Sequence, residues 1–327
     1  MINSFTESQE DYDKWRTAFH LFGIPIYWYS IIFLFAIIFS FIGAIVTAKR
    51  KKIAVEPIEN CVIIVIPCAI VCARLWYVIG DLKDFHSFWA IFDLRAGGIA
   101  IQGGVIGGLV SGYFYFRWQA PKYNHTIYDY FDCIVPNILI GQAIGRWGNF
   151  MNQEVLGWEV PGGIPWLPSW ITDHLHIWDK DRDGVVRVPL FLIESFFNVL
   201  GWIFIMLIFP LFNKKYHFTG IQGGLYFLYY GVLRGILENF RYSDYVMNIK
   251  GVPTSVILSI IFVISSIIYL IYRINYSTPK TWIFVDSNYL PMIKEILTSV
   301  SKFNKNELKI SLKRQHFSEL KLKNDRE

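Results

Sequence analysis

Seven long apolar stretches constrain this chain more than any other feature of its sequence. A helix needs roughly 20 mostly apolar residues to cross a bilayer, and stretches of this kind lie at residues 26–48, 60–80, 97–116, 131–150, 189–212, 221–241 and 252–273. Hydrophobic residues make up 54% of the chain and charged residues only 17%, which excludes an ordinary water-soluble domain. The sequence therefore predicts an all-α polytopic membrane protein with seven transmembrane helices.

Lysine and arginine gather in the connections on one side of the expected membrane. They follow the first, third, fifth and seventh stretches, at Lys49, Arg50, Lys51 and Lys52, at Arg117 and Lys122, at Lys214 and Lys215, and in the basic tail. Because basic connections stay in the cytoplasm, we expect the N-terminus outside and the C-terminus inside. The formal charge of +5 therefore reflects membrane topology and indicates no nucleic-acid partner.

The connections divide the chain into three parts. We expect residues 1–25 to form an extracytoplasmic arm, residues 26–273 the membrane domain, and residues 274–327 a basic cytoplasmic tail. Residues 151–188 are the longest outer connection and are rich in Pro, Gly and Trp, which favours a small extracytoplasmic cap with short strands. The tail has helical periodicity and clustered lysines, as in a surface helix that binds anionic membrane lipids.

Two clusters of polar and ionisable residues lie within the apolar stretches. Ionisable residues are costly in a bilayer, so they usually face the bundle interior and mark a functional site. Members of the second cluster recur every four residues and therefore project from one face of a helix. The clusters are Arg146, Asn149 and Glu154 in GQAIGRWGNFMNQE, and Tyr230, Arg234 and Glu238 in YYGVLRGILENFR.

Each arginine taken singly has a structural explanation. Arg234 and Glu238 are spaced for an ion pair within one helix, and Arg146 is near enough to the end of its stretch to extend to the interface. Two guanidinium groups in one bundle point instead to a phosphate-bearing ligand, because the planar fork of arginine binds phosphate oxygens bidentately. A phospholipid headgroup meets this requirement.

The run GRWGNFMNQE at residues 145–154 resembles the G-R-x-G-N-F-x-N-x-E signature of the prolipoprotein diacylglyceryl transferases. Other matches follow the order of the family over residues 20–273, although the signature run is the most specific. These matches are Tyr29 in YWYS, Arg74 and Tyr77 in ARLWYV, GGIAIQGG at 97–104, Asp132, Glu194 in PLFLIES, and the run YGVLRGILENFR.

The resemblance implies a multi-pass enzyme of the bacterial cell membrane that needs no metal or cofactor. It would transfer the sn-1,2-diacylglyceryl group of phosphatidylglycerol to the lipobox cysteine of a prelipoprotein signal peptide, the first step of lipoprotein maturation. We expect Glu154 and Glu238 to orient the arginines rather than to accept a proton. The implied catalytic residues are Arg146, Arg234, Tyr29, Tyr230 and Gln102, and the implied substrate-binding residues are Arg146, Asn149, Glu154, Arg234, Glu238, Gly103 and Gly104.

One position departs from the family pattern. Many members have histidine in a GGxxxHGG run, where this chain has Gln102, and an amide cannot accept a proton at neutral pH. The general base is therefore open, and Tyr29, Tyr230, a lipid phosphate oxygen and water are the candidates.

Other functional classes fit the sequence less well. Gly-rich helices and intramembrane arginines also suit a non-catalytic lipid or peptide transporter, but the inverted repeat typical of transporters is not evident. An intramembrane protease would need a serine with a helical histidine partner, or paired aspartates, and the apolar stretches show neither. The run DKDRDG at residues 179–184 resembles the start of a calcium loop, but Leu190 stands where a glutamate is required.

Overall fold

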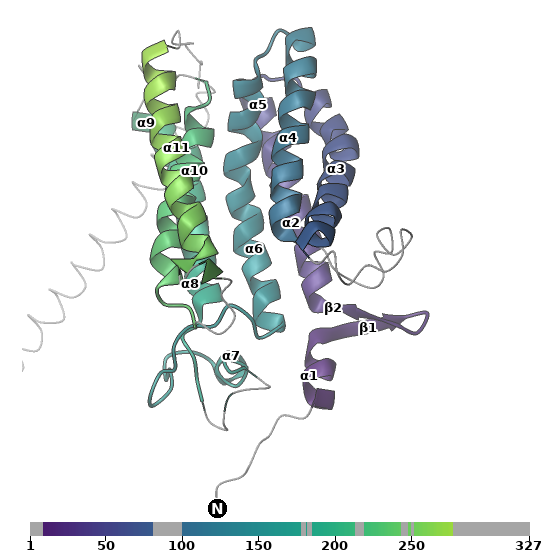
Figure 1. The fold of residues 1–327 in the computed structure, drawn as a ribbon, viewed down its shortest axis with the longest axis vertical. Coiled ribbons are helices and arrows are strands. Elements are labelled where there is room, and N and C mark those ends of the chain that lie inside the picture. The colour runs from purple at the N-terminus through teal and green to yellow at the C-terminus, as the bar shows by residue number, and fades with distance from the viewer. Residues whose placement is uncertain are drawn as a thin grey trace, which may run out of the picture. The chain divides into compact units, whose positions relative to one another are not determined.

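The computed structural model describes residues 9–80, 100–177, 181, 185–212, 219–242, 248–249 and 252–276. The chain divides into two units, residues 1–281 and 282–327, and every described residue belongs to the first. The predicted cytoplasmic tail therefore lies almost entirely outside the described residues. Within these residues the fold is mainly helical, which confirms the predicted class in outline (Figure 1).

Two small β-hairpins accompany the helices among the described residues. After helix α1 (Gln9–Arg16), strand β1 (Thr17–Leu21) pairs antiparallel with β2 (Ile24–Tyr27), and β3 (Asn248–Ile249) pairs with β4 (Val252–Pro253). Phe22 and Gly23 both have positive φ, which gives the tight two-residue turn of the first hairpin. The expectation of an all-α chain is therefore wrong at these two places.

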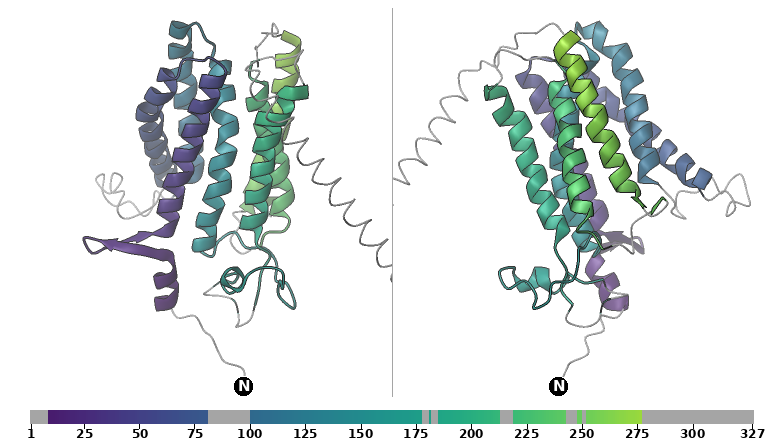
Figure 2. Two further views of the ribbon diagram at one scale, coloured as in Figure 1. Left: turned by 180° about the vertical axis from the view of Figure 1, so that it is seen from behind. Right: turned by 60° about the vertical axis from the view of Figure 1, so that its left-hand side comes forward.

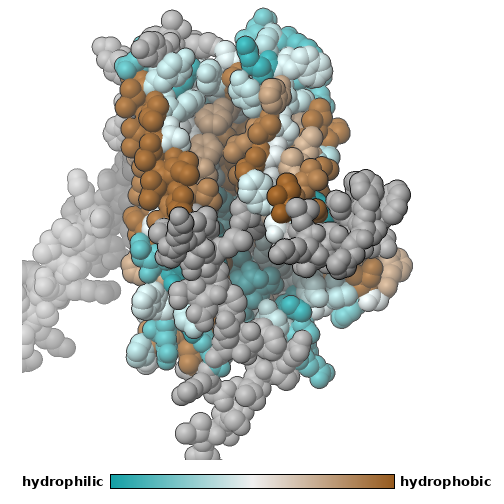
Figure 3. All heavy atoms as spheres, in the orientation of Figure 1, coloured by the Kyte–Doolittle hydropathy of each residue, from teal (hydrophilic) through white to brown (hydrophobic). Residues whose placement is uncertain are grey.

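Helices occupy all seven apolar stretches within the described residues. Five of them are α2 (Trp28–Arg50), α3 (Glu56–Gly80), α4 (Ile101–Gln119), α10 (Ile221–Glu238) and α11 (Thr254–Tyr276). In the part of the chain that the structure describes, four helical segments are long and apolar enough to cross a membrane: Trp28–Arg50, Glu56–Gly80, Leu190–Leu211 and Ser255–Asn275. Figure 3 shows apolar side chains along the flanks of the bundle and hydrophilic ones toward its ends, a pattern expected for contact with lipid.

The fourth and fifth stretches are interrupted helices. The fourth forms α5 (Ile127–Ile134), a 3-10 turn η4 (Val135–Asn137) and α6 (Ile138–Met151). Pro136 has no backbone N–H, so it removes a hydrogen bond from the helix at this point, and the Asn137 side chain donates to the Cys133 carbonyl oxygen at 2.7 Å. The fifth stretch forms α8 (Leu190–Ile203), a π turn η5 (Phe204–Ile208) and α9 (Phe209–Phe212).

The helices pack mainly in pairs. Helix α6 packs against α2 and α8, α3 against α4, and α10 against α11 (Figure 2). The Gly-rich stretch lies in α4, where a Cβ on Gly103 would clash with the Cys72 carbonyl oxygen of α3. A Cβ on Gly104 would lie 3.5 Å from Ala73 Cβ of the same helix α3. These glycines therefore allow α3 and α4 to approach closely.

Residues 151–188, called the cap from here on, are rich in loops. Their described part contains the short helix α7 (Ser169–Thr172), and its strand-like contacts are limited to the isolated bridges Gly157–Arg241 and Glu159–Arg187. The expected short strands are therefore absent from the described part of the cap. Apolar packing holds it together instead, around the buried residues Phe150, Leu156, Ile171, Leu175, Ile177 and Phe191.

The N-terminal residues pack against the cap. Trp15 stacks on His174 with ring centroids 3.6 Å apart, and the Tyr12 hydroxyl donates to the Asn152 carbonyl oxygen at 3.1 Å. The N-terminal arm and the cap therefore lie at the same end of the helix bundle (Figure 1).

A buried ion pair in the cap gives a first testable prediction. Arg187 Nε and the Ile177 backbone N–H donate to Asp181 Oδ2, at 2.6 and 2.7 Å. Burial alone would raise the pKa of Asp181, but these hydrogen bonds outweigh it and lower the pKa below its usual value. Asp181, from the DKDRDG run, is therefore paired with Arg187. The other five residues of that run lie outside the described residues.

Because the folded-state pKa of Asp181 is lowered, its ion pair stabilises the protein above the unfolded pKa and is lost as pH falls through the folded one. We expect Asp181→Asn to melt at a lower temperature than the parent protein at neutral pH. This difference should shrink below about pH 4. Thermal melts in detergent over a pH series measure it, and a difference that stayed constant into strong acid would contradict the ion-pair explanation.

Candidate active site

Charged side chains from three helices meet at the end of the bundle that carries the cap. Arg146 of α6 donates from Nη2 to Glu194 Oε1 at 2.5 Å, and Arg234 of α10 donates from Nη1 to Glu194 Oε2 at 3.3 Å. The Glu194 side chain, on α8, is 1% exposed, whereas those of Arg146 and Arg234 are 15% and 17% exposed. One buried carboxylate therefore binds two guanidinium groups that are still partly accessible to solvent.

A second buried carboxylate extends this cluster. Glu238 Oε2 lies 3.1 Å from Arg234 Nη2, and Glu238 Oε1 lies 3.7 Å from Arg241 Nη1. The cluster contains three partly exposed arginines and two buried glutamates, so its exposed side carries a surplus of positive charge. Such a surplus favours an anionic ligand. We call these five residues the arginine site.

Arg146 also contacts the end of its own helix. Its Nη1 donates to Asn149 Oδ1 at 3.1 Å, and Asn149 Nδ2 donates to Glu154 Oε2 at 3.3 Å. Glu154 is exposed and is linked to Arg146 through Asn149. The orienting role predicted for Glu154 is therefore indirect, whereas Glu238 contacts its arginine directly.

Two tyrosines lie near Arg146. Tyr230 of α10 lies within hydrogen-bonding reach of Arg146. Tyr29 of α2 packs its ring against Gly148, where a Cβ would lie 3.1 Å from Tyr29 Cδ2. Glycine at position 148 therefore lets Tyr29 approach α6 two residues from Arg146. The structure thus places Tyr230 in contact with Arg146 and Tyr29 in its neighbourhood.

The described contacts of the residues predicted on α4 are with α3, which does not contribute to the arginine site. The side chain of Gln102 lies outside the described residues, although α4 begins at Ile101. Gly103 and Gly104 face α3, as described above. The catalytic role implied for Gln102 and the substrate-binding role implied for Gly103 and Gly104 stay predictions.

The sequence pointed to the two arginines, but it gave Glu194 only as a family match and not as the carboxylate that joins them. Glu194 stands alone in the apolar run LFLIESFFNVLGWI, and the cost of a lone carboxylate in a bilayer is itself a signal of an interior partner. Arg241 was missed. It follows Glu238 by three residues, a spacing that permits contact at the end of a helix.

Apolar helices of membrane-spanning length, together with a charged cluster held between three helices, define a multi-pass membrane protein with an interior polar site. The profile of the family described as prolipoprotein diacylglyceryl transferase matches residues 16–272. The chain belongs to this family.

Individual relatives are similar over most of the chain. A relative from Malacoplasma penetrans is 34% identical over 292 residues, which cover 83% of this chain and 79% of the relative. One from Finegoldia magna is 35% identical, covering 77% and 93%, and one from Mycoplasmoides gallisepticum is 33% identical, covering 92% and 90%. All three are named phosphatidylglycerol–prolipoprotein diacylglyceryl transferase. The resemblance seen in the signature run is therefore confirmed, and a transferase is favoured over a transporter.

Proposed function

We propose that this chain transfers the sn-1,2-diacylglyceryl group from phosphatidylglycerol to the lipobox cysteine of a prelipoprotein signal peptide. The observation that carries the proposal is the convergence of Arg146 and Arg234 on the buried Glu194. This arrangement lies in a chain whose family carries out that class of transfer. The arginine site is the proposed binding site for the lipid phosphate.

The reaction forms one carbon–sulfur bond and breaks one carbon–oxygen bond. The cysteine thiolate attacks the glycerol CH2 group that carries the phosphate, and the phosphodiester oxygen leaves with the bonding electron pair as part of glycerol phosphate. Arg146 and Arg234 stabilise the negative charge that develops on this oxygen. Because Glu194 and Glu238 already hold the guanidinium groups, the site needs little reorganisation during the reaction.

The same positive charge also favours ionisation of the cysteine thiol. An unperturbed cysteine has a pKa of about 8.5, so only a few per cent is thiolate at neutral pH. Nearby guanidinium groups favour the thiolate and raise this fraction. Tyr29 and Tyr230 lie beside Arg146 and remain candidates for the base, along with a lipid phosphate oxygen and water.

Recognition of the lipid phosphate can be measured without turnover. Phosphatidylglycerol that binds the native protein should raise its melting temperature in detergent, on the order of 5 °C at about 100 times its dissociation constant. Diacylglycerol, which lacks the phosphate, should raise it much less. Arg234→Lys should reduce the shift in melting temperature given by phosphatidylglycerol but leave the shift given by diacylglycerol unchanged. Equal shifts from the two lipids in the parent protein would show that the phosphate is not recognised.

The proposal includes an orientation in the bacterial cell membrane, with seven spanning helices, the N-terminus outside and the C-terminus in the cytoplasm. The packing of the N-terminal arm on the cap supports a common side for these two segments. The basic run at residues 49–52 lies at the opposite end of the bundle, where the positive-inside rule requires it (Figure 1).

Cysteine labelling in intact cells tests this orientation. In a background without the native cysteines, Trp166→Cys in the cap should react with a membrane-impermeant maleimide. Lys52→Cys is the matched control, because Lys52 is also exposed but lies at the other end of the bundle. It should react only after the cells are opened. The reverse pattern would place the arginine site in the wrong leaflet.

A further inference from the structure

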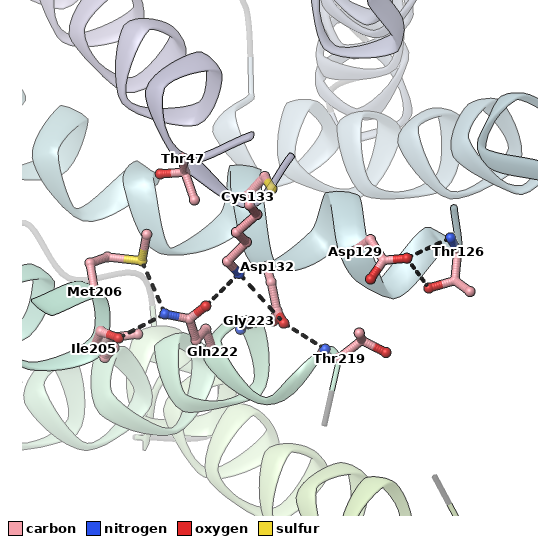
Figure 4. Close-up of polar contacts among 12 residues, drawn as sticks. Thr47, Thr126, Asp129, Asp132, Cys133, Ile205, Met206, Thr219, Gln222 and Gly223 are labelled. Carbon is pink, nitrogen blue, oxygen red and sulfur yellow. Dashed lines mark hydrogen bonds and ion pairs between the residues drawn. The ribbon is translucent and has the colours of Figure 1, made fainter. Parts of the chain in front are cut away.

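A second buried polar cluster, drawn in Figure 4, lies where α2 ends and α10 begins, at the opposite end of these helices from the arginine site. It consists of Lys51 at the end of α2, Asp132 on α5 and Gln222 in the first turn of α10, which are 9%, 5% and 7% exposed. Lys51 Nζ donates to Gln222 Oε1 at 2.5 Å and lies 3.9 Å from Asp132 Oδ2. None of the three takes part in the proposed reaction, so the cluster needs an explanation of its own.

Asp132 holds the N-terminus of α10. The Gly220 N–H donates to Asp132 Oδ2 at 2.7 Å, and the Gly223 N–H donates to Asp132 Oδ1 at 2.9 Å. N–H groups at the start of a helix have no partner within the helix, and a negative charge there also interacts favourably with the helix dipole. Gly220 has a φ of +93°, a conformation that favours glycine, so this turn depends on the residue type. Asp132 therefore joins α5 firmly to α10.

Gln222 connects the same cluster to the helix that carries Glu194. Its Nε2 donates to the Ile205 carbonyl oxygen at 3.0 Å, inside the π turn η5 that continues α8. A π turn interrupts the regular ladder of helix hydrogen bonds, and Gln222 supplies a donor at that point. The cluster thus contacts the continuations of all three helices that form the arginine site.

The two arginines are separated from this cluster by the same number of residues. Arg146 follows Asp132 by 14 residues, and Arg234 follows Gly220 by 14 residues. At about 1.5 Å per residue, Arg234 lies about 21 Å along α10 from the Asp132–Gly220 contact, and the path from Asp132 through α5, η4 and α6 to Arg146 has a similar length. Helices α6 and α10 run in the same direction, because they are linked at one end by this contact and at the other by Glu194. Similar lengths from the Asp132–Gly220 contact bring both guanidinium groups to the level of Glu194.

We propose that Asp132 is a positioning residue that sets the register of α6 and α10, and through it the separation of Arg146 and Arg234. The consequence for catalysis rests on the proposed phosphate site, whereas the register itself does not. A misplacement of about 1 Å at a reacting centre can cost about a hundredfold in rate. Loosening this distant contact should therefore slow transfer although Asp132 touches no substrate.

Asp129→Asn is the matched control for Asp132→Asn. Both aspartates are buried on α5, but Asp129 accepts hydrogen bonds from the Thr126 backbone N–H and hydroxyl at the start of its own helix, at 2.7 and 2.8 Å (Figure 4). We expect Asp132→Asn to lower kcat about tenfold to a hundredfold, with a smaller change in KM for phosphatidylglycerol. Asp129→Asn, at a comparable loss of melting temperature, should keep kcat close to that of the parent. If kcat instead follows melting temperature equally in both variants, the positioning role is wrong.

A distance measurement separates this inference from the phosphate site. Spin labels on cysteines introduced at Gly145 on α6, where a side chain meets open space, and at Asn239 at the end of α10 report the separation of the two helices. The parent protein and Asp129→Asn should give one narrow distance distribution, and Asp132→Asn a broader or shifted one. An unchanged distribution in folded Asp132→Asn would overturn the register role, whatever the arginine variants show. Should Asp132→Asn fail to fold, Gln222→Leu is measured by the same two readouts and judged by the same outcomes.

Discussion

Arg146→Ala and Arg234→Ala are each expected to lower the rate of diacylglyceryl transfer by about a hundredfold to a thousandfold. Each change removes a charge-assisted contact to an oxygen whose negative charge grows in the transition state, a loss of about 3–4 kcal/mol. The measurement is turnover of a lipobox peptide by the purified variants with phosphatidylglycerol as donor. Thermal melts in detergent confirm that each variant is folded.

Lysine variants separate the charge of the arginines from their shape. Arg146→Lys and Arg234→Lys keep the positive charge but lose the planar fork that binds two phosphate oxygens, so we expect only partial recovery of turnover. The fork also matters for Glu194, because each arginine must hold a Glu194 oxygen and still contact the phosphate. Near-normal turnover in all four folded variants would make both arginines structural and refute the phosphate site.

Glu194→Leu is expected to have the largest effect on folding. Glu194 is closed from solvent and holds two guanidinium groups, so its loss leaves these charges poorly compensated in a medium of low dielectric. Removing one partner of a buried ion pair typically costs about 3–5 kcal/mol, a large part of the stability of an average domain. Unfolding followed in detergent measures this loss, and turnover should fall close to background.

Two further variants test whether the charge of Glu194 is responsible. Glu194→Gln keeps the size of the side chain and one acceptor oxygen, so we expect an intermediate loss of stability and activity. Ser195→Ala is the control at the next position, where the Ser195 hydroxyl donates to the Ala143 carbonyl oxygen at 2.8 Å. Losing that neutral hydrogen bond should cost about 1 kcal/mol. If Glu194→Leu is as stable and active as Ser195→Ala, Glu194 does not organise the site.

The positions of the helices could be predicted from sequence because they depend on local properties. Length and hydrophobicity belong to each segment, and all seven apolar stretches are helical in the described residues. The break at Pro136 also has a local cause, which a prediction of one helix over residues 131–150 overlooked. The π turn at Phe204–Ile208 is different, since its hydrogen-bond donor Gln222 comes from another helix and leaves no mark in the surrounding sequence.

The contacts of the arginine site likewise fall into local ones, which could be predicted, and long-range ones, which could not. Contacts within one helix, such as Arg146 with Asn149 and Arg234 with Glu238, follow from spacings of three or four residues and could be predicted. Glu194 is 48 residues from Arg146 and 40 residues from Arg234, so its contacts arise only when three helices pack together. Helix packing likewise decides that Gly103 faces α3, a contact that the Gly-rich pattern alone does not specify.

Mass spectrometry of a lipobox peptide incubated with the purified protein and phosphatidylglycerol of known acyl chains tests the central claim most directly. We predict that the peptide gains one diacylglyceryl group on its cysteine through a thioether, that one glycerol phosphate is released per modified peptide, and that a Cys→Ser peptide stays unmodified. Arg146→Ala should yield almost no product in the same time. A peptide that stays unmodified with the folded parent protein, or that receives a single acyl chain as a thioester, would contradict the proposed transfer.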